Sequence, residues 1–119
     1  ATFTQYAGIE ALTGPQDFVE EMVSEYQNRR NRMLELVNAI PGVYAQKPQG
    51  AFYLFPNIKA TGLSSKEIAT RLIDEAGVAI LSGTDFGEGG EGYIRLVYAN
   101  SMEKIEEGME KLASWFKSL

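Results

Sequence analysis

Arg95 is the residue whose type and surroundings most clearly suggest chemistry. It stands inside segment 93–99, Tyr-Ile-Arg-Leu-Val-Tyr-Ala, which is otherwise uncharged and mostly apolar. A guanidinium in such a segment needs an anionic partner to offset the loss of its hydration. Because arginine is planar and always charged, it can bind a carboxylate through two parallel hydrogen bonds. The sequence therefore makes Arg95 a candidate for binding the carboxylate of a ligand.

The residues alone leave Arg95 two further possible roles, both structural. A carboxylate of the same domain would neutralise it, or its strand would lie at a sheet edge and let the guanidinium reach water. Segment 50–56, Gly-Ala-Phe-Tyr-Leu-Phe-Pro, has the pattern of a core strand, with Phe52 and Leu54 on one side. Segment 83–87 would present Phe86 either to a partner or to the core.

The rest of the catalytic inventory is thin. There is no histidine and no cysteine, which removes Ser-His-Asp and Cys-His machinery, zinc sites with those ligands, haem, iron–sulfur clusters and disulfides from these residues. A net charge of −5, from 16 acidic and 11 basic residues, argues against nucleic-acid binding. No apolar run approaches the roughly 20 residues of a membrane span, and residues 1–10 lack the pattern of a signal peptide. We therefore expect a cytoplasmic location.

The glycine-rich segment 87–92, Gly-Glu-Gly-Gly-Glu-Gly, satisfies the G-x-G-x-x-G pattern. A dinucleotide site needs a strand before these glycines and a helix after them. Here a strand is expected to follow, and two glutamates would repel phosphate. Calcium binding through Asp85, Glu88 and Glu91 does not have the spacing of an EF-hand. We expect a turning loop and no metal site.

These residues must be positioned by a small α+β domain covering 1–119. Apolar periodicity and breakers predict helices over 2–12, 15–40 and 64–76 and a last helix capped by Asn100. Ser64 and Glu67 have the spacing of a capping box. Strands are expected over 43–46, 51–56, 78–81 and 93–99, the first two forming a hairpin. The predicted order is ααββαββα, with a mostly antiparallel sheet of about four strands and helices on one face.

Several short segments, in this order and spacing, resemble one known family. They are Gly50-Ala51-Phe52-Tyr53, Glu75-Ala76-Gly77-Val78-Ala79, Ser82-Gly83 with Phe86-Gly87, Gly92-Tyr93-Ile94-Arg95-Leu96 and Tyr98-Ala99-Asn100. Together they resemble the C-terminal, small domain of class I, aspartate aminotransferase-like enzymes of fold type I, which use pyridoxal 5′-phosphate. The resemblance covers essentially the whole chain.

The resemblance implies a role for each of two residues. Arg95 would hold the α-carboxylate of the amino-acid substrate, and Phe52 would lie near it and help to close the site. The intact homodimeric enzyme would transfer an amino group between an L-amino acid and a 2-oxo acid. The family's large domain carries the Schiff-base lysine and binds the cofactor; Lys47, Lys59, Lys66, Lys104, Lys111 and Lys117 match no such motif.

The same resemblance implies that the chain is a fragment, inactive alone, with 1–14 a remnant of the connection from the large domain. Which amino acid serves as donor stays open. The alternative is a free-standing, non-catalytic α+β module that binds a small carboxylate metabolite or a protein partner, an interpretation that the thin catalytic inventory favours.

Overall fold

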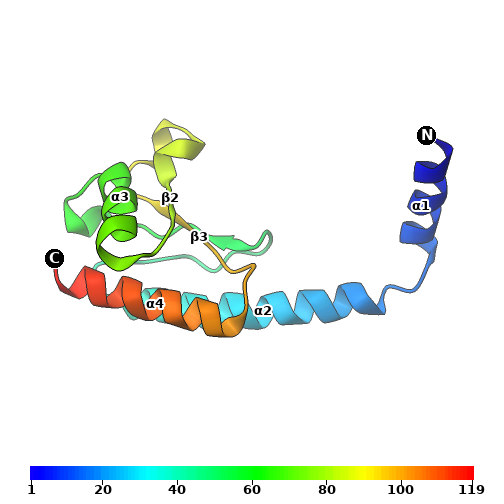
Figure 1. Ribbon diagram of the computed structural model, residues 1–119, viewed down its shortest axis with the longest axis horizontal. Coiled ribbons are helices and arrows are strands. Elements are labelled where there is room, and N and C mark those ends of the chain that lie inside the picture. The colour runs from blue at the N-terminus through cyan, green and yellow to red at the C-terminus, as the bar shows by residue number, and fades with distance from the viewer.

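The computed structural model describes residues 1 to 119 and has the expected α+β class (Figure 1). The α-helices are α1 (Thr2–Thr13), α2 (Asp17–Asn38), α3 (Ser65–Ala76) and α4 (Met102–Lys117). The strands are β1 (Tyr53–Leu54), β2 (Leu81–Ser82) and β3 (Ile94–Val97), and the short 3-10 helices are η1 (Lys59–Thr61), η2 (Gly83–Phe86) and η3 (Glu88–Gly90).

The sheet is antiparallel and has β3 as its central strand, in the order β1-β3-β2. Ile94 and Leu96 are buried, whereas the side chains that alternate with them, those of Arg95 and Val97, belong to the other face. Since successive side chains of a strand alternate between faces, one face of the sheet is covered and the other is open. The expectation that the helices pack on one face is confirmed.

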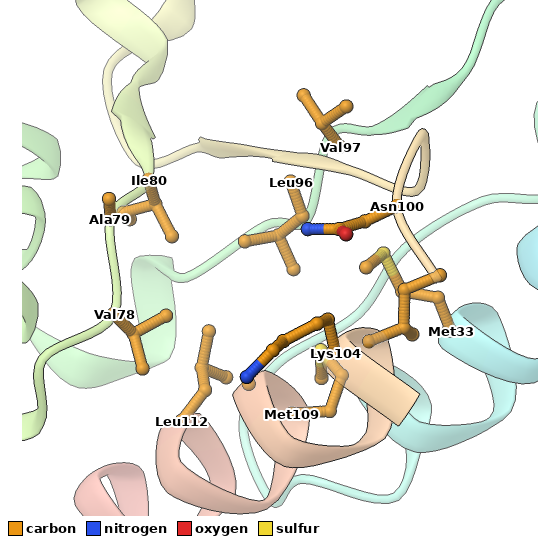
Figure 2. Close-up of a pocket in the computed structure, with 12 residues that line it drawn as sticks. Met33, Val78, Ala79, Ile80, Leu96, Val97, Asn100, Lys104, Met109 and Leu112 are labelled. Atoms are coloured by element: carbon orange, nitrogen blue, oxygen red, sulfur yellow. The ribbon is translucent and has the colours of Figure 1, made fainter. Parts of the chain in front are cut away.

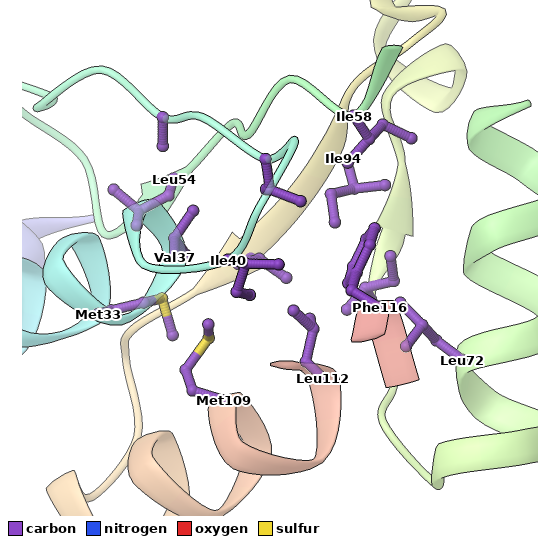
Figure 3. Close-up of a cluster of buried hydrophobic side chains, with 14 of the residues drawn as sticks. Met33, Val37, Ile40, Leu54, Ile58, Leu72, Ile94, Met109, Leu112 and Phe116 are labelled. Carbon is purple, nitrogen blue, oxygen red and sulfur yellow. The ribbon is translucent and has the colours of Figure 1, made fainter. Parts of the chain in front are cut away.

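The core lies between the covered face of the sheet and helices α2, α3 and α4 (Figure 3). Val37 of α2 and Met109 and Leu112 of α4 point toward Leu54 and Ile94 of the sheet. Removing an aliphatic side chain of this size from water stabilises the fold by about 1.5–3 kcal/mol. The buried neighbours of Arg95 are thus held firmly, and the central strand has a defined position.

The sheet has three strands rather than the four expected. Segment 43–46 forms only one isolated bridge, between Tyr44 and Asn57, so the predicted hairpin is wrong. The physical reason lies in Asn38, whose side-chain oxygen accepts from the N–H of Ala45 at 2.8 Å and whose amide donates to the carbonyl of Ala45 at 3.2 Å. A side chain therefore satisfies the backbone groups that a second strand would have used, and the observed order is ααβαββα.

The residue that caps the N-terminus of α3 is the one predicted from the sequence, whereas the capping residue of α4 is not. Ser64 caps α3 by accepting from the N–H of Glu67 at 3.2 Å, as the capping box predicts. The cap of α4 is Ser101, which accepts from the N–H of Lys104 at 3.3 Å, and not Asn100. The side chain of Asn100 is used one residue earlier, because it accepts from the N–H of Ser101 at 2.9 Å.

The predicted helix over 2–12 is confirmed, but α1 and the beginning of α2 project away from the core (Figure 1). No residue of α1 is buried, and its apolar side chains, Phe3, Tyr6, Ile9 and Leu12, are exposed. The connecting role expected for 1–14 stays a prediction. None of the helices combines the length and the apolar character needed to span a membrane.

Candidate functional site

Arg95 lies in the middle of the open face of the sheet. It occupies the central strand and pairs with Leu81 of β2 across the ladder. The interpretation of this arginine as a sheet-edge residue is therefore wrong. Its flanking residues in β3 are both buried, so the backbone of Arg95 is anchored while its half-buried side chain extends from the opposite face.

Aromatic rings surround the guanidinium of Arg95. The Cζ atom lies 4.2 Å from the ring centroid of Phe86 and 5.2 Å from that of Tyr53. Phe86 comes from η2, directly after β2, and Tyr53 comes from β1, so the rings are supplied from both sides of β3. Both distances are within the range of attractive cation–π contacts. These rings hold the cation but do not neutralise it.

No acidic residue of the chain pairs with Arg95. The seven salt bridges all involve other arginines or lysines. The Nε atom of Arg95 is buried and has no hydrogen-bond partner. Leaving a charged donor in this state is costly, and the predicted alternative of an internal carboxylate is wrong. The guanidinium is therefore free to pair with an anion from outside this chain.

Phe52 lies next to this site rather than in the core. Its side chain is 51% exposed, so the prediction of a core position for Phe52 is wrong, although Leu54 is buried as that prediction required. The alternation fails because Ala51 has a φ of 61°, which turns the backbone just before β1. The rings of Phe52 and Tyr53 meet edge to face, with centroids 6.3 Å apart. Tyr53 thus contacts both residues that the resemblance assigns to substrate binding.

Tyr98 supports the turn that carries Phe52. Its backbone N–H donates to the carbonyl of Phe52 at 2.9 Å, and its hydroxyl donates to the carbonyl of Ala51 at 3.0 Å. Burial raises the pKa of the Tyr98 phenol above its ordinary value, against an opposing effect of the charge on Arg30. The phenol therefore keeps its proton at neutral pH and remains a hydrogen-bond donor.

The sequence alone did not place Tyr53 or Phe86 beside Arg95. For Tyr53 the sequence offered one indication. Because side chains alternate along a strand, the ring of Tyr53 lies on the opposite face from Leu54, which is the open face of the sheet in the structure. Phe86 follows a glycine-containing turn, and no local pattern shows which way such a turn presents its aromatic ring.

A pocket lined mostly by apolar side chains lies elsewhere in the molecule. It has a volume of about 140 Å³ and is enclosed by the 78–80 segment, β3 and α4 (Figure 2). Leu96, Met109 and Leu112 line it, so it belongs to the covered side of the sheet. The amino group of Lys104, which also lines it, is already paired with Glu107 at 2.8 Å. This pocket has no free charge to bind an anion and is separate from Arg95.

The lysines of this chain all lie on its surface. All six lysines have exposed side chains, and the amino group of Lys59 lies 5.0 Å from the ring centroid of Tyr93. A lysine that forms a Schiff base must lie in an enclosed site that lowers its pKa or positions it toward the cofactor. None of these lysines has such surroundings.

The geometry defines an α+β domain that carries an unpaired arginine on the open face of its sheet, and comparison with known proteins identifies its family. The family model described as aminotransferase class I and II matches residues 1–112. The chain therefore belongs to the class I and II aminotransferases.

Individual relatives agree with this assignment. The chain is 45% identical over 114 residues to an aspartate aminotransferase of Pyrococcus horikoshii, covering 94% of this chain and 29% of that protein. It is 47% identical over 118 residues to aromatic-amino-acid aminotransferase 2 of Thermococcus litoralis, covering 98% and 30%. The solved aromatic aminotransferase of Pyrococcus horikoshii superposes with a TM-score of 0.92 at 44% identity, over 98% of this chain and 32% of that one. The chain thus spans about 30% of the length of such relatives.

Proposed function

We propose that the chain is the small, substrate-binding domain of an aminotransferase that transfers an amino group between an L-amino acid and a 2-oxo acid. The observation that carries this proposal is the guanidinium of Arg95, which lies on the open face of the sheet without an internal carboxylate. Every amino-acid and 2-oxo-acid substrate brings a carboxylate, and a planar arginine is the residue best suited to bind it.

In this proposal Arg95 acts by binding and orientation. Its guanidinium holds the α-carboxylate and so restricts the rotation of the substrate, which lowers the entropy cost of reaching the reactive arrangement. Phe52, half-exposed beside Tyr53, covers the bound carboxylate and excludes water. Removing water strengthens the ion pair between the carboxylate and Arg95.

The cofactor and the catalytic lysine would belong to a large domain outside these residues. One solved relative, from Clostridium difficile, is named a PLP-bound putative aminotransferase, and pyridoxal phosphate supplies the electron-withdrawing chemistry of such enzymes. The exposed apolar side chains of α1 and the exposed Phe18 and Met22 of α2 would contact this domain or the second subunit of a homodimer.

A second candidate function is a non-catalytic module that binds a small carboxylate. It is favoured by the six exposed lysines and by the lack of histidine and cysteine. Both functions use Arg95 in the same way, so they differ only in whether a lysine-bearing domain works with it. Cloning the complete reading frame that contains these residues, and testing its product for amino-group transfer, distinguishes them.

The role of Arg95 is tested in that complete protein with two variants. Arg95→Leu removes both the charge and the hydrogen-bond donors. Arg95→Lys keeps the charge but cannot make the two parallel hydrogen bonds of a guanidinium. We expect KM for the amino acid to rise 10- to 150-fold in Arg95→Leu, because a hydrogen bond to a charged group contributes about 1.5–3 kcal/mol. Arg95→Lys should have an intermediate KM. Unchanged KM and kcat in both variants would show that Arg95 does not bind the substrate.

A further inference from the structure

Phe86 is the ring closest to the Arg95 guanidinium, and the resemblance implies no role for it. We propose that Phe86 is a positioning residue, whose ring holds the guanidinium of Arg95 in the direction needed to receive a carboxylate. This inference rests on the proposed function of Arg95. It deepens that function by naming what keeps the binding group in place.

Arg95 needs such a residue because no polar contact in the chain directs its head group. An arginine side chain has several freely rotating bonds, and binding is weakened when they must be frozen on association. The buried Nε atom makes no hydrogen bond, and none of the salt bridges includes Arg95. The ring of Phe86, 4.2 Å from Cζ, lies closer than that of Tyr53 at 5.2 Å. A ring face attracts the cation without occupying its hydrogen-bond donors.

The ring of Phe86 is itself held by a row of aromatic side chains. It meets Phe55 edge to face, with centroids 6.2 Å apart and an interplanar angle of 79°. Phe55 in turn stacks on Tyr93 at 5.5 Å and 16°. Because such pairs have preferred geometries, the row restricts the tilt of Phe86. A half-exposed aromatic ring on a loop is thereby given a defined orientation over Arg95.

The loop over residues 83–92, which contains Phe86, is held by close contacts and hydrogen bonds near both of its ends. The backbones of Gly83 and Gly90 approach so closely that a Cβ on either residue would overlap the carbonyl oxygen of the other. The buried hydroxyl of Ser65 accepts from the N–H groups of Gly92 and Tyr93, at 2.8 and 3.1 Å. The close approach explains why positions 83 and 90 are both glycine. These contacts also make the loop a rigid support for the ring.

The proposal is tested in the complete holoenzyme with unreactive ligands. The probe is a monocarboxylate, 3-phenylpropanoate or butanoate, whichever binds the wild type more tightly, and it is paired with its own uncharged amide. Dissociation constants are measured by calorimetry and as inhibition constants. The ratio of amide to acid dissociation constants isolates the carboxylate contact from the fit of the rest of the ligand. The variants are Phe86→Leu, Phe86→Tyr and Arg95→Leu, with Phe86→Met replacing Phe86→Leu if that variant does not fold.

We expect Phe86→Leu or Phe86→Met to weaken acid binding by about 3- to 30-fold, the range of a partly desolvated cation–π contact, and to leave amide binding unchanged. Phe86→Tyr, which keeps the ring, should retain the wild-type ratio. An unchanged ratio in Phe86→Leu, or equal weakening of acid and amide, would overturn the inference. If Arg95→Leu keeps the wild-type ratio, the proposed function of Arg95 itself is wrong. If the ratio falls in Arg95→Leu but stays at the wild-type value in Phe86→Leu, the proposed function holds and only the role of Phe86 is wrong.

Discussion

The hydroxyl of Tyr98 donates to the carbonyl oxygen of Ala51 at 3.0 Å and so ties the segment after β3 to the turn before β1. Tyr98 is 2% exposed, and Ala51 has a positive φ of 61° that is unfavourable for a residue with a side chain. A part-buried hydrogen bond therefore supports a strained turn. The same turn exposes Phe52 beside the candidate binding site.

Tyr98→Phe should lower the free energy of unfolding of the 119-residue chain by about 0.5–1.5 kcal/mol, because the carbonyl of Ala51 loses its donor while packing is kept. Urea unfolding followed by circular dichroism measures the change. Tyr44→Phe is the matched control, since Tyr44 is 60% exposed and its hydroxyl should contribute nothing. Equal effects of the two substitutions would contradict the importance assigned to the Tyr98 bond.

Gly108→Ala should stabilise the chain by up to about 1 kcal/mol, because glycine is a poor residue inside a helix. A Cβ at this position of α4 would meet no atom within 4 Å. The contrasting variant is Gly83→Ala, whose Cβ would overlap the backbone of Gly90. We expect it to unfold at lower temperature than the wild type. Thermal unfolding compares the three proteins, and a destabilised Gly108→Ala would be the adverse result.

Glu107 should make stability depend on acid pH. Lys104 and Lys111 bind its carboxylate at 2.8 and 2.7 Å and lower its pKa from the ordinary 4.5 to about 2. Because the pKa is lower in the folded state, the contribution is present above the unfolded pKa. It is lost as the pH falls from about 4.5 toward 2.

Unfolding midpoints measured across this pH range for the wild type and Glu107→Gln provide the check. The variant should lose part of the acid dependence, and high salt should reduce the difference, because the pair is exposed to solvent. Glu110→Gln, on the same helix and in no salt bridge of the chain, is the control. A Glu107→Gln curve that runs parallel to the wild type through this pH range would contradict the prediction.

Pyridoxal phosphate added to the 119-residue chain should form no stoichiometric adduct. The six lysines are all exposed, so each should react weakly and reversibly. Borohydride reduction followed by intact mass and peptide mapping measures the outcome. We expect scattered, substoichiometric labelling, and one lysine labelled to completion would mean that the chain contains a cofactor site of its own.

Much of the fold was predictable from the sequence because its causes are local. Apolar periodicity indicated the four α-helices, and Ser64 with Glu67 marked a helix start that the structure has. The predicted strand over 43–46 was wrong because Asn38, outside that segment, satisfies the backbone of Ala45. A pattern of apolar residues does not show that a side chain will take the backbone hydrogen bonds that a neighbouring strand would otherwise make.

For the candidate site, residue types and their order along the chain were enough to single out Arg95 and to suggest the family. Both inferences depend only on residues that are close together in the sequence, such as a charged residue within an apolar segment. Whether that cation is free was decided only by folding. The antiparallel sheet puts β3 in the centre, leaves Arg95 without an acidic partner and brings Tyr53 and Phe86 to the guanidinium. Contacts between segments distant in the chain arise from packing in three dimensions, which no local spacing encodes.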